Sequence, residues 1–254
     1  MAHSQLAAQM YTLRDFAKTP KTLAEALKKV KAIGYDAVQI SGVCAIEYSE
    51  LHKMLEDNGL SCCATHISFE LMRDNPTKVI QDHYTIQCKY PAIGGLPGQY
   101  RNAEGYAKFA KEATEVGKRL AEGGVYFGYH NHSFELEKFG GRTGLATIYE
   151  DSDPRYVKAE IDTYWIQHGG GDAAAWIEKL KGRIPLVHLK DMTVRKGNPI
   201  MSEIGEGNMN WKAILAACKD AGVEWYIVEQ DTCERDPFES LAISFKNLKA
   251  MGIK

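Results

Sequence analysis

Residues Gly128–Glu137 read GYHNHSFELE and complete an aromatic, β-branched run, Gly124–Tyr129, that is typical of a buried strand. Because side chains alternate along a strand, His130 and His132 point the same way at its end. Glu135 lies in the loop that follows. These are ligand and proton-transfer groups, although one histidine could equally be a hydrogen-bonded core residue and Glu135 a solvated loop acid.

Three later predicted strands end in the same kind of residue. Their exits read EIDTYW at Glu160–Trp165, VHLKD at Val187–Asp191 and VEQD at Val228–Asp231. A solvated loop residue is the simplest interpretation of any one of these acids taken alone. Four equivalent exits together predict one site assembled from several strands.

The rest of the chain alternates between predicted strands and helices without a Pro/Ser-rich linker. The first helix shows the expected signals, with Thr19 as its cap, Pro20 at its first position and Gly34 after its end. The predicted strands are Gln5–Tyr11, Asp36–Ile40, Leu60–His66, Tyr90–Gly94, Val125–His130, Val157–Asp162, Ile184–Leu189 and Trp225–Glu229. The predicted helices are Thr19–Ile33, Ile46–Asn58, Pro76–Cys88, Asn102–Glu122, Gly144–Tyr149, Asp172–Lys181, Asn210–Ala221 and Asp236–Ala250.

Such alternation requires parallel strands joined by right-handed crossovers, and eight strand–helix units close into a barrel. The alternative is an open doubly wound sheet, but Gly169–Gly171 lacks the GxGxxG spacing of its phosphate-binding turn. We therefore predict an α/β fold, a single (β/α)8 TIM barrel forming one domain over residues 1–254. The carboxyl ends of its strands would meet at one mouth.

Three carboxylates and one imidazole would reach this mouth from the fifth to eighth strands: Glu135, Asp162, His188 and Glu229. This set suits one divalent ion of intermediate hardness, with Mn²⁺, Co²⁺, Mg²⁺ and Zn²⁺ as candidates. Other residues expected at the mouth are candidates for sugar binding, with packing or capping as equally good interpretations: Gln9, Tyr11, Arg14, His66, His130 and Trp165.

The charge and composition of the chain argue against binding to nucleic acid or membranes. The 254 residues carry a net charge of −2 with a pI of about 6.5, so no basic surface for nucleic acid or an anionic membrane is indicated. No run approaches the roughly 18 apolar residues of a membrane span. The 6 cysteines form no CxxC pair, which is typical of reduced thiols. We expect a cytoplasmic protein that acts on a small molecule.

Several motifs in the chain are shared with one superfamily. They are QMYTLRD at Gln9–Asp15, YHNH at Tyr129–His132, IDTYW at Ile161–Trp165, HLKD at His188–Asp191, EIGEG at Glu203–Gly207, EQD at Glu229–Asp231 and DPFES at Asp236–Ser240. Together they resemble the xylose-isomerase-like TIM barrels, most closely the sugar phosphate isomerase/epimerase branch with its ketose 3-epimerases and inosose dehydratases. The resemblance implies one divalent metal ion, commonly Mn²⁺, a sugar or keto-sugar substrate, and frequent homo-oligomers.

The resemblance also implies the reaction of a metal-dependent sugar isomerase or epimerase, which abstracts a proton next to a metal-bound sugar carbonyl. Glu135 and Glu229 would be its acid and base. Two positions depart from the epimerase pattern. Epimerases place the first glutamate nearer the strand end, so Glu135 reaches back or His130 or His132 replaces it. Trp165 stands where epimerases usually have a substrate-binding histidine.

These departures favour an alternative, a lyase or dehydratase that eliminates a β-oxygen from a keto-sugar or keto-glycoside. Glu135 or Glu229 would remove the proton beside the carbonyl, and Lys190 or His132 would assist loss of the oxygen. Lys190 follows a predicted ligand by two residues and so shares its side of the strand. A rim ion pair between Lys190 and Asp191 is the other interpretation of this lysine.

Overall fold

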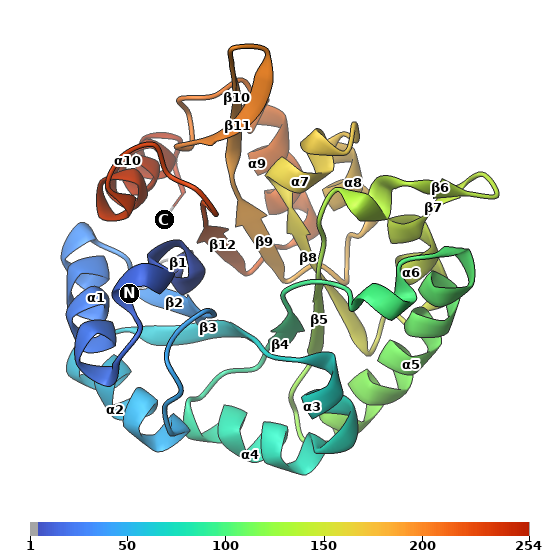
Figure 1. Ribbon diagram of the computed structural model, residues 1–254, viewed down its shortest axis with the longest axis horizontal. Coiled ribbons are helices and arrows are strands. Elements are labelled where there is room, and N and C mark those ends of the chain that lie inside the picture. The colour runs from blue at the N-terminus through green and yellow to red at the C-terminus, as the bar shows by residue number, and fades with distance from the viewer. Residues whose placement is uncertain (1–4, 254) are drawn as a thin grey trace.

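The computed structural model describes residues 5–253, in which eight parallel strands form a closed barrel surrounded by helices (Figure 1). The predicted TIM-barrel fold is confirmed. Around the barrel the strands run in chain order, and the last pairs with the first, with Leu6 opposite Tyr226. The strands are β1 (Leu6–Gln9), β2 (Ala37–Ile40), β3 (Ser61–His66), β4 (Pro91–Ile93), β5 (Phe127–His130), β8 (Val157–Asp162), β9 (Leu186–Leu189) and β12 (Trp225–Val228).

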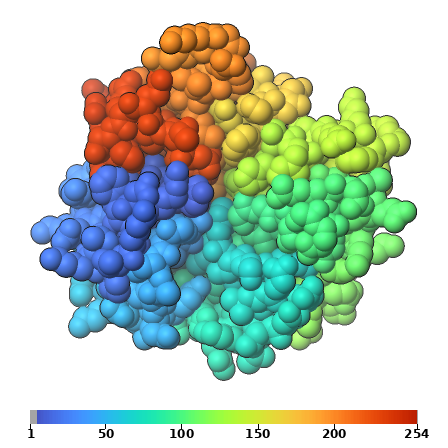
Figure 2. Space-filling view, viewed as in Figure 1, coloured from blue at the N-terminus to red at the C-terminus, as the bar shows by residue number. Residues whose placement is uncertain are grey.

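Eight helices correspond to the predicted ones, with ends that differ by a few residues. They are α1 (Pro20–Ile33), α2 (Tyr48–Asp57), α4 (Pro76–Thr85), α5 (Ala103–Glu122), α6 (Gly144–Asp151), α8 (Ala173–Lys179), α9 (Trp211–Ala221) and α10 (Pro237–Ala250). In α1, Thr19 and Thr22 form a reciprocal cap. In the space-filling view the first segments (blue) lie beside the last ones (red) (Figure 2). None of the helices within residues 5–253 is long and apolar enough to cross a membrane.

The loops at the mouth contain structure that we did not predict. Short helices follow five of the barrel strands, and two hairpins project from the mouth. These elements are α3 (Phe69–Asp74), α7 (Thr163–His168), the 3-10 helices η1 (Met10–Phe16), η2 (Gly98–Tyr100) and η3 (Phe134–Leu136), the hairpin of β6 (Lys138–Phe139) with β7 (Arg142–Thr143), and the hairpin of β10 (Asp191–Arg195) with β11 (Asn198–Ser202). Strand β1 ends two residues earlier than predicted, because the Gln9 side chain accepts a hydrogen bond from the Tyr11 amide and starts η1.

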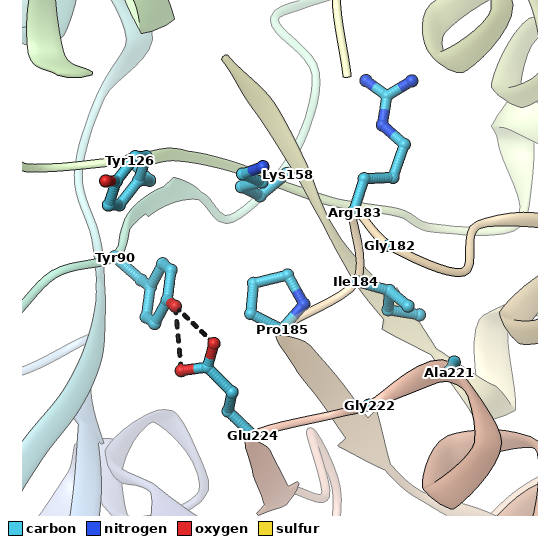
Figure 3. Close-up of a pocket in the computed structure, with 10 residues that line it drawn as sticks. All are labelled: Tyr90, Tyr126, Lys158, Gly182, Arg183, Ile184, Pro185, Ala221, Gly222 and Glu224. Carbon is cyan, nitrogen blue, oxygen red and sulfur yellow. Dashed lines mark hydrogen bonds between the residues drawn. The ribbon is translucent and has the colours of Figure 1, made fainter. Parts of the chain in front are cut away.

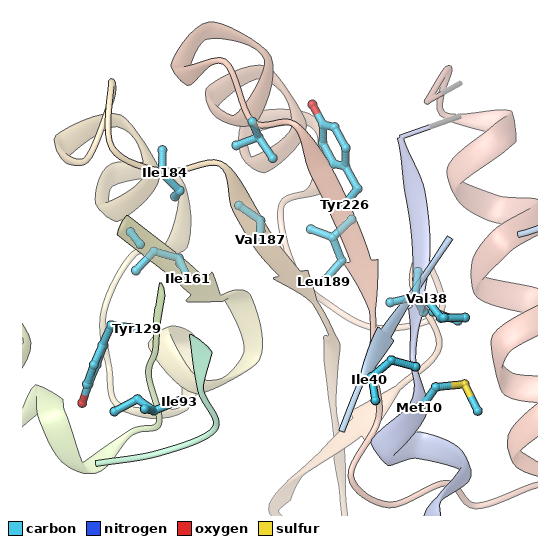
Figure 4. Packing of buried hydrophobic residues seen from close by; sticks show 14 of the residues in the cluster. Met10, Val38, Ile40, Ile93, Tyr129, Ile161, Ile184, Val187, Leu189 and Tyr226 are labelled. Carbon is cyan, nitrogen blue, oxygen red and sulfur yellow. The ribbon is translucent and has the colours of Figure 1, made fainter. Parts of the chain in front are cut away.

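The two sides of each barrel strand have different environments. In β9, Val187 and Leu189 point outward into the hydrophobic layer beneath the helices (Figure 4). Leu186 and His188 alternate with them and point into the barrel. Inside the barrel, a lower layer is apolar, whereas the layer above it, toward the mouth, is polar. The lower layer includes Ala7, Ala37, Leu186 and Ile227, and the polar layer consists of Gln9, Gln39, Glu160 and His188, all fully buried.

Candidate metal centre

Four side chains from four neighbouring strands meet just below the mouth. They are His130 at the end of β5, Asp162 at the end of β8, His188 in β9 and Glu229 directly after β12. One ligand atom of each lies within 4.8 Å of the others, and the four residues are 0 to 4% exposed. The register of the barrel pairs Asp162 with His188, which brings these two side chains to the same level. We call these four residues the ligand group.

Three members of the ligand group were predicted from the sequence, but the structure places Glu135 outside it. The Glu135 carboxylate accepts hydrogen bonds from the Tyr129 hydroxyl at 2.7 Å and the His132 amide at 2.9 Å. Burial raises the pKa of Glu135 to about 7 in spite of these hydrogen bonds. Glu135 is therefore not one of the four residues that meet here. The turn after β5 occupies its oxygens, and His130 from the strand itself takes the fourth position.

Lys190 brings a cation into the ligand group. Its Nζ lies 3.0 Å from Asp162 Oδ2, 2.8 Å from Glu229 Oε2 and 2.7 Å from Asp231 Oδ2. Burial lowers the pKa of Lys190, but the carboxylates outweigh burial and raise this pKa above its usual range. The alternative rim pair with Asp191 is not formed, because Asp191 accepts from the Trp211 indole at 2.6 Å instead.

The charges of the ligand group depend on one another. Burial lowers the pKa of His188, but Glu160 and Glu229 outweigh it and raise that pKa to about 10. Burial raises the pKa values of Asp162 and Glu229, and the neighbouring Lys190 and histidines more than reverse the effect. Both carboxyl groups are therefore ionised at neutral pH. Such a concentration of buried, mutually dependent charges is typical of functional sites.

Two observations indicate that the ligand group suits a divalent metal ion. Two carboxylates and two imidazoles are the donors that Mn²⁺, Co²⁺ and Zn²⁺ accept in proteins. In addition, Nε2 of His130 faces Asp162 Oδ2 at 3.1 Å, and Nδ1 of the same ring is buried without a hydrogen-bond partner. An unpartnered buried nitrogen destabilises a protein unless a ligand satisfies it.

Two further unpartnered nitrogens border the same space. They are Nδ1 of His132 and Nε1 of Trp165, both buried, and the two rings lie 5.2 Å apart. The Trp165 ring also lies 5.7 Å from Nζ of Lys190. Burial lowers the pKa of His132 to about 3, so its imidazole is neutral at neutral pH. Each of the two rings thus has a buried nitrogen that no protein group satisfies.

The other predicted sugar-binding residues are engaged within the protein. Gln9 donates to Gln39 at 2.8 Å, and His66 Nε2 lies 2.7 Å from Glu160. The Arg14 guanidinium lies 4.4 Å above the Tyr11 ring and donates to the Asp231 carbonyl at 2.8 Å.

Glu160 and Asp231 lie beside the ligand group but were not predicted from the sequence as site residues. Each is two residues from one of its members, Glu160 before Asp162 and Asp231 after Glu229. Strand period 2 was the signal that could have found them.

A cavity of about 360 Å³ opens at the opposite end of the barrel, where the strands begin (Figure 3). Tyr90, Tyr126, Lys158 and Pro185 line it, and the Tyr90 hydroxyl lies 2.9 Å from both carboxylate oxygens of Glu224. Lys158 donates to the Pro154 carbonyl at 3.0 Å. The charged groups that line this cavity thus have partners, in contrast to the buried nitrogens of His130, His132 and Trp165 at the mouth.

The chain is similar to known proteins in both sequence and fold. Residues 27–250 match the model of the xylose isomerase-like TIM barrel. A sugar phosphate isomerase/epimerase from Parabacteroides distasonis has a TM-score of 0.84 at 22% identity, covering 100% of this chain and 96% of that one. A D-tagatose 3-epimerase-like protein has a TM-score of 0.71 at 18% identity, covering 97% and 96%. At these identities the structures show the fold alone.

An inosose dehydratase from Geobacillus thermodenitrificans is 29% identical over 150 residues, which are 50% of this chain and 48% of that protein. The chain thus spans about half the length of the curated relatives it matches. The family model covers most of the chain, from the first helix to the last. The protein therefore belongs to the xylose isomerase-like TIM barrel family.

Proposed function

We propose that this protein is a divalent-metal-dependent enzyme that removes the proton beside the carbonyl of a small sugar or keto-sugar. The observation that carries the proposal is the buried ligand group with Lys190 beside it. The ligand group would hold the metal through His130, Asp162, His188 and Glu229. A divalent ion bound there would polarise the carbonyl and stabilise the charge that develops as the proton leaves.

Glu229 is the residue that we propose as the base. It is ionised at neutral pH, and it lies at the end of the barrel that opens to the mouth loops. Lys190 would donate a hydrogen bond to a substrate oxygen. Because its pKa is raised, Lys190 stays charged and acts as an electrostatic donor rather than as a proton source. Asp231 positions Lys190 through their 2.7 Å ion pair.

His132 and Trp165 would hold the sugar next to this centre. Their unpartnered nitrogens, Nδ1 and Nε1, are suited to sugar hydroxyls, and the indole ring offers an apolar surface for a sugar face. The neutral state of His132 leaves one ring nitrogen as a donor and the other as an acceptor.

The asymmetry of the site favours elimination over epimerisation. An epimerase of the kind that the sequence suggests needs a glutamate on each face of the sugar, and Glu135 is bonded to Tyr129 and His132 instead. In an elimination, Glu229 would take the proton beside the carbonyl and pass it to the departing β-oxygen, so that water or an alcohol leaves. The cationic Lys190 would stabilise that oxygen through a hydrogen bond. The likeness of half the chain to an inosose dehydratase supports the same reaction. Isomerisation or epimerisation is the second candidate, supported by the epimerase-like structural neighbours.

Proton NMR of a panel of sugars and keto-sugars in D₂O tests the proposal. We expect the Mn²⁺-reconstituted protein to exchange a C–H beside a carbonyl and to form an unsaturated keto product. Protein stripped with chelator should do neither. Failure of every substrate in the panel to exchange that C–H would contradict the proposal.

The variant Lys190→Met separates the two reactions. In a lyase it should slow product formation by at least about 100-fold, a loss of roughly 2.7 kcal/mol of transition-state stabilisation, while C–H exchange survives. If the wild type only interconverts epimers, and Lys190→Met leaves that rate within about threefold, the enzyme is an isomerase and the lyase assignment is wrong.

A further inference from the structure

Glu160 is a carboxylate enclosed in the middle of the barrel, in the same polar layer as His188 of the ligand group. It is 0% exposed, and it contacts residues from three other strands. Its Oε2 lies 2.7 Å from His66 Nε2, and its Oε1 lies 3.2 Å from His188 Nε2. Gln39 donates to the same Oε1 at 2.7 Å. No step proposed above uses Glu160, although an ionised group at such a position is costly to bury.

The hydrogen bonds around Glu160 fix the orientation of each neighbour in turn. The Tyr11 amide donates to Oε1 of Gln9, so the Gln9 amide group faces Gln39 and donates to its Oε1 at 2.8 Å. The Gln39 amide group must face Glu160, because a carboxylate only accepts. Oε1 of Gln39 is therefore the atom that lies 2.6 Å from Nε2 of His188.

His188 consequently has two acceptors at Nε2, which are Oε1 of Gln39 and Oε1 of Glu160. Nε2 must carry a proton and donate it. The other ring nitrogen, Nδ1, points the opposite way, 2.7 Å from Oε2 of Glu229 and 3.8 Å from Oδ2 of Asp162. Nδ1 is therefore the nitrogen on the side of the ligand group.

We infer that Glu160, together with Gln39, is a positioning residue that keeps the Nε2 proton of His188 inside the barrel and leaves Nδ1 as the metal-binding nitrogen. Histidines that bind metals usually donate their second N–H to a carboxylate or carbonyl, which fixes the ring and strengthens the ligand. This inference rests on the proposed function in so far as it assigns a metal to His188. The hydrogen bond itself does not depend on a metal.

A second metal ion is the competing interpretation, because His66, Glu160 and His188 also offer ligand atoms within 4.8 Å of one another. Two ions would have to share the single imidazole of His188, which would need to lose both of its ring protons. The contact between Gln39 and Nε2 requires that nitrogen to keep its proton. One ion per chain, with Glu160 bonded to His188 on the side away from the ligand group, agrees with all of these contacts.

Zinc binding tests the inference, since Zn²⁺ is diamagnetic and its affinity can be measured by competition with a chelating dye. We expect Glu160→Gln to weaken Zn²⁺ binding by about 10- to 100-fold, as loss of such supporting carboxylates does elsewhere. Glu160→Asp keeps the charge and should lose less. Glu203→Gln is the matched control. It changes another buried carboxylate, which accepts from Ser240 at 2.7 Å, and should bind zinc like the wild type.

Nitrogen-15 NMR of histidine-labelled protein provides a readout that a general loss of stability would not mimic. In the wild type, with or without zinc, His188 should show a slowly exchanging Nε2–H, assigned by its absence in His188→Gln. Glu160→Gln should shift this resonance and speed its exchange, and Glu203→Gln should not.

Three results would overturn the inference. The first is a proton on Nδ1 of His188 in the zinc-loaded protein. The second is a Glu160→Gln variant whose zinc affinity and Nε2–H resonance equal those of the wild type. The third is a wild type that binds two zinc ions per chain, one of which is lost in Glu160→Gln. A wild type that binds no zinc and no Mn²⁺ would instead refute the proposed function. In that case the resonance in the metal-free protein still decides whether Glu160 holds His188.

Discussion

The two ends of the barrel bury very different groups. Near the mouth, five ionisable side chains are at most 4% exposed: Glu160, Asp162, His188, Lys190 and Glu229. They make ion pairs with one another between 2.7 and 3.2 Å. The opposite end has the cavity of about 360 Å³, whose carboxylate, Glu224, is exposed and bonded to Tyr90.

This difference shows that buried charge locates the site better than empty volume does. Removing an ion from water costs several kcal/mol, and ion pairing inside a protein often fails to recover that amount. A cluster of such ions therefore indicates a function that requires them. The cavity at the opposite end carries no comparable cost, and the amino-terminal ends of barrel strands usually contribute to stability rather than catalysis.

The largest effect on stability should follow from removing the cation at the mouth. Lys190→Met leaves Asp162, Glu229 and Asp231 without their shared ammonium, so metal-free protein should lose about 3–5 kcal/mol of its free energy of unfolding in urea. The half-buried Lys158 at the opposite end is the control. Lys158→Met should change that free energy by less than about 1 kcal/mol. Equal losses for the two variants would remove the distinction between the ends.

The next effect distinguishes His130 from Glu135 as the fourth member of the ligand group. We expect His130→Gln to weaken binding of Zn²⁺ by at least about 10-fold, because it removes an imidazole from the donor set. Glu135→Gln should stay within about threefold of the wild type, since the Glu135 carboxylate is bonded to Tyr129 and His132. Competition with a chelating dye measures both. A larger loss of Zn²⁺ affinity in Glu135→Gln than in His130→Gln would show that Glu135 is the fourth ligand.

A separate effect, on acid stability, concerns a histidine outside the mouth. His83 in α4 lies between Thr65 at 2.8 Å and the Val79 carbonyl at 2.7 Å, and burial lowers its pKa to about 4. The unfolded chain binds this proton more tightly, so the stabilisation is complete above pH 6.5 and declines as the pH falls toward 4. By pH 5 the loss should be about 2 kcal/mol.

Urea unfolding at pH 7.5 and pH 5 measures this loss, and His83→Gln should abolish the His83 share of it. Metal affinity at pH 7.5 should be the same in His83→Gln and wild type. The two buried histidines differ in charge at neutral pH. Burial keeps His83 neutral, whereas neighbouring carboxylates raise the pKa of His188 to about 10. A His83→Gln variant with the same pH dependence as the wild type would show that this buried histidine does not control acid stability.

The barrel and most of the ligand group were predictable from the sequence because both follow from short-range periodicity. The alternation of strands and helices determined the fold, and strand period 2 brought Asp162, His188 and Lys190 to the same side. Glu135, by contrast, lies outside the ligand group, because its position depends on a turn. No pattern in the letters SFEL indicates that η3 bonds this carboxylate to Tyr129.

The polar layer inside the barrel was not predicted for a different reason. Gln9, Gln39 and Glu160 lie on three different strands. Each glutamine is a single polar residue in an apolar strand, and Glu160 stands between Lys158 and Asp162 in a strand that is already charged. Their hydrogen bonds exist only after the barrel closes. We predicted that Gln9 and His66 would bind sugar hydroxyls, whereas the structure shows them within this network.

Metal content is the most direct test of the ligand group. Wild type and Asp162→Ala are stripped with chelator, reconstituted with Mn²⁺ or Zn²⁺ and desalted, and bound metal is then counted per chain, with circular dichroism to confirm that both are folded. We predict close to one ion per wild-type chain and almost none in Asp162→Ala, because Asp162 contributes a fully buried carboxylate to the ligand group. Equal metal content in the two folded proteins would contradict the assignment of the site.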